Sequence, residues 1–322
     1  MPLGGFFGGL LAGKLIDLWG RRSTLMMVCV PLIIGWLLIA YANGVAMLLV
    51  GRFVTGFCAG ILTLSAPVYI AETSTPKARG FLGSGFQLSI TCGVLTVYVV
   101  GTYLPWSYLA AVCAYFPLVQ LLILCFMPET PTWLIKTNQI QQATEAVFFL
   151  YGNDHNLLAL SLTRDNMDAD GPRSNVIIDA FTKTKYRYPI IICLAVMFFQ
   201  QFSGINAIMF YTVSIFDAAK SSVNSNLATI IVGIVQMLVT LLACFLMDKM
   251  GRRLLLLVSA LSMAVAMSIM SVYYFLLDSR GAAFNDDFGW IPLVAILLFI
   301  VAFSIGYGPI PWLLMSELIP IR

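Results

Sequence analysis

The sequence predicts an all-α membrane protein, and three observations support this prediction. Hydrophobic residues make up 60% of the 322 residues and charged residues only 10%, against roughly 25% charged in an ordinary soluble domain. The mean hydropathy is +0.92. The apolar residues also gather in runs long enough to cross a bilayer, which takes about 20 residues of helix. So few charges cannot cover a globule of this size with a solvated surface, which excludes a water-soluble fold.

Composition also excludes several kinds of chemistry. The net charge of +3 is too small to indicate a nucleic-acid partner. The single histidine, His155, lies in a polar linker, so no Ser-His-Asp or Cys-His arrangement can form. The cysteines lie inside apolar stretches without metal-ligand spacing: Cys29, Cys58, Cys92, Cys113, Cys125, Cys193 and Cys244. We expect neither enzymatic activity nor a cofactor nor a metal site.

Charge-free apolar runs, ten segments in all, predict about nine membrane helices. The run Ser23–Gly51 holds two spans, separated by the turn-like Tyr41–Gly44. The run Gly80–Pro128 also holds two, separated by Gly101–Pro105. The other spans are a partial one at Met1–Gly13, Phe53–Ala71 after Arg52, Tyr188–Phe216, Ser221–Met247, Leu254–Leu277 and Phe288–Ser316. All are apolar on every side, which suits lipid or a helix bundle.

The distribution of Lys and Arg predicts the orientation of these helices. The even-numbered loops hold only Lys220 and Arg280, and Arg52 stands at a helix start. All other basic residues lie in the odd-numbered loops or at the end of the chain, so we expect these loops to be cytoplasmic. The first helix would then start at the outer face, so further residues are expected before Met1. The opening segment Met1–Gly13 lacks a basic n-region and a cleavage site, so we do not expect it to be a signal peptide.

Two motifs recur at corresponding places in the chain. Asp17–Arg22 (DLWGRR) is repeated 231 residues later as Asp248–Arg253 (DKMGRR). A looser pair is Pro67–Glu72 and Pro311–Glu317, followed by Arg79 and Arg322 respectively. We therefore expect two similar half bundles, residues 1–128 and 188–322, joined by a polar cytoplasmic linker, residues 129–187. Two parallel halves around a central site are typical of one large class of secondary transporter.

With these motifs the chain resembles the sugar porters of the major facilitator superfamily, especially the glucose facilitators and the insect trehalose facilitators. Besides the two repeats, the motifs are Gly51-Arg52-Phe53, Pro128-Glu129-Thr130-Pro131, Gln200–Ala207 (QQFSGINA) and Gly308–Trp312 (GPIPW). The resemblance implies the twelve-helix major facilitator fold. The nine predicted helices correspond to the second to the tenth of that fold, so the first helix and the last two are expected to lie outside this sequence.

Neutral amides predict the sugar site. A sugar hydroxyl stripped of water costs roughly 2–7 kcal/mol unless it finds a partner, and an amide both donates and accepts. The amides deep in the spans are Gln87, Gln200, Gln201, Asn206 and Gln236. The alternative for each is a bridge between helices. The resemblance implies that Gln87, Gln200, Gln201, Asn206 and Trp312 contact the sugar. Gln201 and Asn206 flank Ser203-Gly204, where we expect the helix to unwind.

A second segment predicts a gate. Gly306, Gly308, Pro309 and Pro311 lie within six residues of one span. Because proline removes a backbone donor and kinks a helix, this segment is expected to be non-ideal and mobile, the alternative being a static kink. The gate candidates are Tyr211, Ser304, Gly308, Pro309 and Pro311, and Tyr211 can instead anchor the membrane interface. The family's glucose transporters commonly carry Asn where Gln236 stands and Glu where Ser304 stands, so the substrate is expected to be trehalose or a hexose.

Charged residues at the cytoplasmic helix ends predict a conformational latch. The resemblance implies that Asp/Glu–Arg sets join the two halves while the inside is closed and separate on inward opening. The alternative is surface salt bridges worth at most about 1 kcal/mol. Arg52, at or within the membrane, is functional by default. The latch residues are Asp17, Arg21, Arg22, Arg52, Glu72, Arg79, Glu129, Asp248, Arg252, Arg253, Glu317 and Arg322.

Together these features predict facilitative transport of a sugar by alternating access, with the sugar and the lipid bilayer as partners. No carboxylate lies in the middle of a predicted span, which favours a uniporter. A proton-coupled symporter is the alternative, because in the resembled family the coupling acid lies on the first helix. A non-transporting sugar sensor and an inactive truncated product are further alternatives. We expect an integral protein of the plasma membrane with cytoplasmic charged loops, and the sequence leaves the particular sugar and the oligomeric state open.

Overall fold

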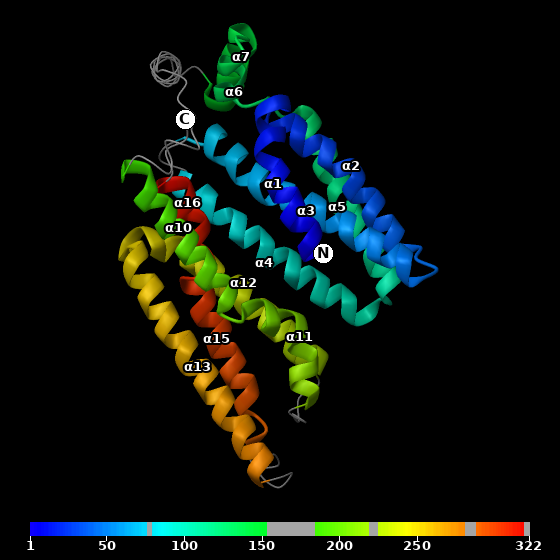
Figure 1. The fold of residues 1–322 in the computed structure, drawn as a ribbon, viewed down its shortest axis with the longest axis vertical. Helices are drawn as coiled ribbons and strands as arrows, with labels where there is room; N and C mark the ends of the chain where they lie inside the picture. Colours follow the sequence, from blue (N-terminus) through cyan, green and yellow to red (C-terminus); the bar gives the residue numbers. More distant parts are fainter. Residues whose placement is uncertain (76–78, 153–183, 219–224, 281–287, 319–322) are drawn as a thin grey trace. The chain divides into compact units, whose positions relative to one another are not determined.

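The structure is a computed structural model that describes residues 1–75, 79–152, 184–218, 225–280 and 288–318. Within those ranges every regular element is a helix (Figure 1), which confirms the predicted all-α class. Most of the linker, including His155, lies outside the described residues. The contacts divide the chain into two compact units, which are described separately below.

Eight segments of the described residues are long and apolar enough to cross a membrane. They are Arg21–Ala40, Val45–Thr73, Phe81–Tyr103, Trp106–Phe126, Arg187–Ile215, Leu227–Met247, Arg252–Ser279 and Ile291–Leu314. The partial span predicted at Met1–Gly13 is present as α1 (Pro2–Trp19). It falls outside this set because Lys14, Asp17 and its glycines lower its hydropathy.

One predicted boundary is wrong. Helix α3 runs without interruption from Val45 to Thr73, so the spans expected on either side of Arg52 are a single helix and Arg52 lies inside it. Gly51 does not end a helix here. It lets α3 approach α2 (Arg21–Ala40) closely, because a Cβ at Gly51 would lie 2.8 Å from Cγ1 of Ile39.

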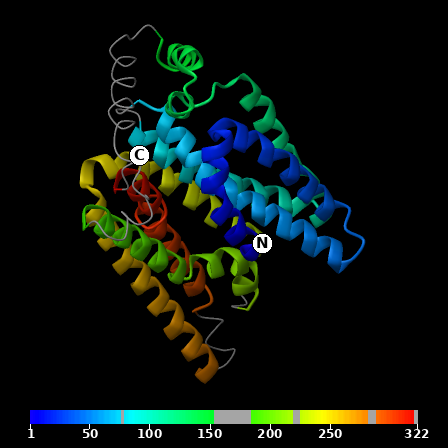
Figure 2. The same cartoon turned by 45° about the horizontal axis from the view of Figure 1, so that its top comes forward.

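The first unit contains α1, α2, α3, α5 (Trp106–Phe126), α6 (Pro131–Lys136) and α7 (Ile140–Tyr151). Helices α1 and α2 both pack along α3, and α5 packs on α2 (Figures 1 and 2). The contact between α1 and α3 is close because glycines face backbone. A Cβ on Gly8 would lie 2.1 Å from the carbonyl oxygen of Phe57, and one on Gly60 would lie 2.3 Å from that of Gly5. Small residues of this kind allow membrane helices to associate through van der Waals contact.

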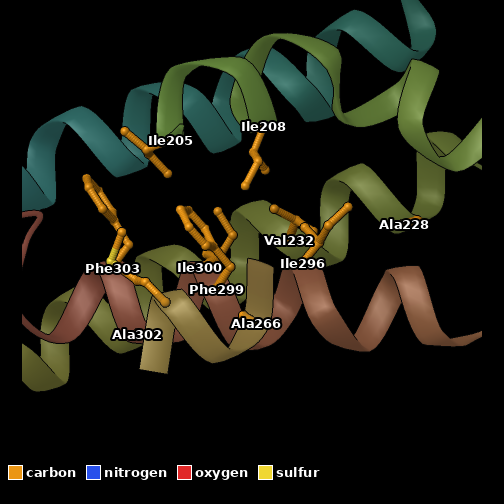
Figure 3. Packing of buried hydrophobic residues seen from close by; sticks show 11 residues of the cluster. Ile205, Ile208, Ala228, Val232, Ala266, Ile296, Phe299, Ile300, Ala302 and Phe303 are labelled. Atoms are coloured by element: carbon orange, nitrogen blue, oxygen red, sulfur yellow. The ribbon is translucent and has the colours of Figure 1, made fainter. Parts of the chain in front are cut away.

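The second unit contains α4 (Arg79–Tyr103), α10 (Thr184–Phe202), α11 (Ile205–Ala218), α12 (Ser225–Met250), α13 (Arg252–Arg280), α15 (Ile291–Ile305) and α16 (Ile310–Leu318). Helix α15 is central to it and packs against α11, α12 and α13. Figure 3 shows Ile205 and Ile208 of α11 directed toward Phe299 and Ile300 of α15 within a buried apolar cluster. The division into half bundles at residues 128 and 188 stays a prediction.

The two repeated motifs have the same local structure. In each, one glycine with positive φ separates two long helices: Gly20 (φ 88°) stands between α1 and α2, and Gly251 (φ 82°) between α12 and α13. L-residues with a Cβ avoid this region of backbone space, and glycine does not. The repeat seen in the sequence is thus a repeated helix–glycine–helix corner.

Candidate functional site

Two of the eight spans are broken helices, as predicted. The span Arg187–Ile215 consists of α10 and α11, which meet at Ser203-Gly204, where Gly204 has φ +87°. The Ser203 hydroxyl donates to the carbonyl oxygen of Gln200 at 2.7 Å and so supplies a partner at the end of α10. The span Ile291–Leu314 consists of α15 and α16, separated by Gly306–Pro309. Irregular backbone at membrane depth is tolerated where it lines a cavity or is buried in protein.

The break between α15 and α16 has a hydrogen-bond pattern that follows from its sequence. Phe303 accepts two backbone N–H groups, from Gly306 at 3.3 Å and from Gly308 at 2.8 Å. Pro311 has no N–H, so the carbonyl of Tyr307 loses the donor that a regular helix would supply from four residues ahead. These features confirm the predicted departure from ideal helix geometry. Mobility of the segment stays a prediction.

Gln200 supplies the missing donor. Its Nε2 lies 2.6 Å from the carbonyl oxygen of Tyr307 and 3.3 Å from that of Gly308. The residue is buried, and its Oε1 has no hydrogen-bond partner. This amide of the predicted sugar site therefore joins α10 to the break between α15 and α16, and only its acceptor is left unsatisfied.

Ser259, on α13, contacts the same break. Its Oγ donates to the carbonyl oxygen of Ala302 at 2.7 Å and accepts the backbone N–H of Tyr307 at 3.2 Å. It is 1% exposed. Sequence reasoning missed this residue, because a serine in an apolar helix usually bonds within its own helix. Ser268 does so, donating to Ala264 at 2.9 Å.

Gln201 and Asn206 meet across the first break. Nδ2 of Asn206 donates to Oε1 of Gln201 at 2.7 Å, and both residues are exposed. The structure thus brings together the two amides that the sequence singled out on either side of Ser203-Gly204. Because both are exposed, this bond can be exchanged for hydrogen bonds to a polar ligand.

The remaining predicted sugar contacts lie in the same unit. Gln87 of α4 and Gln236 of α12 are both buried, and Oε1 of Gln236 has no partner. The ring of Trp312, on α16, packs edge-on against Phe86, the neighbour of Gln87, with centroids 5.8 Å apart. The gate candidate Ser304 is also buried, with an unpartnered hydroxyl oxygen. Pro309 and Pro311 are buried at the break, and Tyr211 is exposed on α11.

A buried oxygen atom without a hydrogen-bond partner lowers the stability of the folded chain by about 1–3 kcal/mol, so such atoms are uncommon. Three of them, on Gln200, Gln236 and Ser304, belong to residues that the sequence predicted for the site or its gate. All three are hydrogen-bond acceptors and neutral. Such a set suits a ligand that is rich in hydroxyl donors and carries no charge.

The predicted latch contains a buried ion pair in the first unit. Nη2 and Nε of Arg21 lie 2.8 Å and 3.1 Å from Oε1 of Glu72. The side chains are 10% and 2% exposed. Oε2 of Glu72 accepts the hydroxyl of Thr132 at 2.6 Å. Asp17 is more peripheral, 3.9 Å from Arg21, and its side chain is 61% exposed.

Glu129 caps a helix. Its carboxylate accepts the backbone N–H groups of Arg21 and Arg22, both at 2.9 Å, and of Ser23 at 3.2 Å. These are free donors in the first turn of α2, where negative charge is favourable. Gly20 leaves room for the carboxylate, since a Cβ there would lie 2.5 Å from Oε2.

Arg22 makes the complementary contact at the other end of a helix. Its guanidinium donates to the carbonyl oxygens of Leu124 and Cys125 at 2.8 Å and 2.9 Å, at the C-terminal end of α5. Arg52 lies 3.7 Å from the sulfur of Met1. Arg252 and Arg253 start α13. Contacts of the latch candidates Arg79, Asp248, Glu317 and Arg322 fall outside the described side chains, so a latch between halves stays a prediction.

Comparison with known proteins places the chain among transporters. Residues 1–322 match the family described as "Sugar (and other) transporter". The facilitated trehalose transporter Tret1 of Anopheles gambiae is 40% identical over 323 residues, which cover 99% of this chain and 40% of that protein. Tret1 of Apis mellifera ligustica is 38% identical over 325 residues, which cover 100% of this chain and 64% of that protein. The chain thus spans about two fifths to two thirds of the length of these relatives.

Solved structures show the same fold. The xylose transporter XylE from E. coli, in a partially occluded inward open conformation, has a TM-score of 0.80 and 26% identity, over 98% of this chain and 74% of XylE. The proton:xylose symporter XylE bound to 6-bromo-6-deoxy-D-glucose has a TM-score of 0.78 and 27% identity, over 98% of this chain and 70% of XylE.

Proposed function

Because the chain belongs to the family of sugar and other transporters, we propose that it moves a sugar across a membrane, down its gradient, by alternating access. This is a family of membrane transporters and not a class of enzymes. The observation that supports the proposal most directly is the set of neutral amides at two broken helices, of which Gln200 joins one break to the other.

The chemistry of this set suits a sugar. None of the predicted contacts is ionised, so the site matches a neutral polyol without burying a charge. Gln200 and Gln236 present acceptors, and the Gln201–Asn206 pair can both donate and accept. Trp312 supplies an aromatic surface for the apolar face of a pyranose ring. Affinity is expected to be weak, because a carrier must release what it captures.

We infer trehalose or a hexose as the substrate. The Tret1 relatives are named for trehalose, and the solved XylE structures are named for xylose and for a bound glucose derivative. The protein is proposed to lie in the plasma membrane with its charged loops in the cytoplasm. At the cytoplasmic helix ends, the Asp/Glu–Arg latch is proposed to separate when the transporter opens toward the cytoplasm. The break between α15 and α16 and the side chain of Tyr211 are proposed to act as gates.

Proton-coupled symport is the second candidate, because the similar XylE is described as a proton:xylose symporter. Uptake of labelled trehalose and glucose into proteoliposomes, at two external pH values, tests both. The assay compares this chain with a version extended at both ends. Uptake that is independent of the proton gradient supports the uniporter, and uptake driven by an inward proton gradient supports the symporter. If neither form moves either sugar although one of them binds it, a sensor replaces the carrier.

The site itself predicts a loss of transport on mutation. Gln201→Leu and Asn206→Leu each remove one partner of the pair across the first break, so we expect sugar uptake to be abolished while expression stays normal. The control is Gln142→Leu, which changes an exposed glutamine on α7. Normal uptake by both site variants would contradict the assignment.

A further inference from the structure

Ser259 replaces two backbone hydrogen bonds that α15 loses at its break. In an uninterrupted helix the carbonyl of Ala302 would accept the N–H of Gly306, and that of Phe303 would accept the N–H of Tyr307. Gly306 instead donates to Phe303 at 3.3 Å. The carbonyl of Ala302 and the N–H of Tyr307 are then both satisfied by the single hydroxyl of Ser259, at 2.7 Å and 3.2 Å.

Tyr307 is held from two other helices at once. Its N–H donates to Ser259 of α13, and its carbonyl accepts Nε2 of Gln200 of α10. Its position therefore depends on both side chains. If the peptide groups of Tyr307 move, the carbonyl oxygen that accepts the hydrogen bond from Gln200, a predicted sugar contact, moves with them.

The backbone of the break lies very close to α13. A Cβ on Gly306 would lie 2.6 Å from Cβ of Ser259 and 2.6 Å from the carbonyl oxygen of Leu255. Glycine at this position brings the backbone of the break within reach of a side chain as short as serine. The hydroxyl uses both its donor and its acceptor capacity across this contact.

We propose that Ser259 is a positioning residue for transport, an inference that rests on the proposed function. It holds Tyr307 so that Gln200 keeps its orientation toward the sugar and α16 keeps its place beside α10. Without the hydroxyl, the carbonyl of Ala302 and the N–H of Tyr307 lose their partner on α13. The break is then no longer fixed to α13, and the carbonyl of Tyr307 can move away from Gln200.

The first test measures the hydrogen bond without any transport. Amide hydrogen–deuterium exchange of the 322-residue chain in detergent is followed by mass spectrometry on peptides that cover residues 303–313. Ser259→Ala is expected to make the Tyr307 amide exchange about tenfold faster, because its hydrogen-bond acceptor is lost. Ser259→Thr keeps the hydroxyl and is expected to exchange at the wild-type rate. The matched control is Ser268→Ala, which removes a hydroxyl from the same helix but touches no break.

The second test measures transport. Ser259→Ala is expected to lower the maximal rate of sugar uptake about tenfold and to shift the half-saturating concentration, with both restored by Ser259→Thr. Equal exchange in the Ser259→Ala and wild-type chains would overturn the proposal whether or not the chain transports. Altered exchange with unaltered uptake would also overturn it. If Ser259→Ala alters the exchange but the unmutated chain moves no sugar, the proposed function is wrong. In that case Ser259 holds Tyr307 in a chain that does not transport.

Discussion

Replacing Glu72 with leucine is expected to lower the free energy of unfolding by about 3–5 kcal/mol. The guanidinium of Arg21 would lose both of its contacts with Oε1 and stay buried, with only the exposed carboxylate of Asp17, 3.9 Å away, left as an ion-pair partner among the described residues. The hydroxyl of Thr132 would lose its acceptor as well. The free energy is measured by unfolding the purified chain in mixed micelles with increasing denaturing detergent.

Two further variants distinguish the stability lost with the buried ion pair from the stability lost when any charge is removed. Lys136→Gln breaks the pair between Lys136 and Asp17, whose side chains are 62% and 61% exposed. Its expected cost is within about 1 kcal/mol. The double change Arg21→Met with Glu72→Leu removes both charges together, so it should recover most of the lost stability. Equal costs for Glu72→Leu and Lys136→Gln would show that burial does not govern this pair.

The second large effect is expected from a single methyl group. Gly8→Ala would place a Cβ 2.1 Å from the carbonyl oxygen of Phe57 and 2.9 Å from its carbonyl carbon, both of them backbone atoms of α3. Neither atom can rotate away, so α1 must separate from α3. Overpacking of this kind costs typically 1–3 kcal/mol, and we expect Gly8→Ala to lie near the upper end of that range.

Gly9 offers a matched control on the same helix. A Cβ at Gly9 meets nothing within 4 Å, and alanine is favoured over glycine within a helix by about 1 kcal/mol. Gly9→Ala should therefore be neutral or stabilising, whereas Gly8→Ala is expected to destabilise the chain. Thermal unfolding in detergent, followed by fluorescence, distinguishes them. Similar midpoints for both variants would refute the close contact between α1 and α3.

The sequence predicted structure correctly where a feature depends on the residues at that position alone. The two helix breaks were predicted from Ser203-Gly204 and from the glycines and prolines after Ile305, and both are present. A proline removes its own N–H, and a glycine admits positive φ, wherever the chain lies in the fold. The error at Arg52 has the opposite origin. The predicted spans were divided at the charge of Arg52, but α3 continues through it and packs on α2 at Gly51.

The sequence by itself determined that this chain is a helical membrane protein with a repeated motif, with two breaks in its spans and with neutral amides beside the first of them. Hydropathy, the missing N–H of proline and the backbone freedom of glycine are properties of single residues, so the sequence alone shows them. The tertiary structure alone decided the partners. It placed Glu129 on the first turn of α2, gave the donor of Gln200 to Tyr307, and brought Ser259 to the same break. Each of these bonds joins residues 48 or more positions apart, so it depends on which helices approach one another and leaves no local signal in the chain.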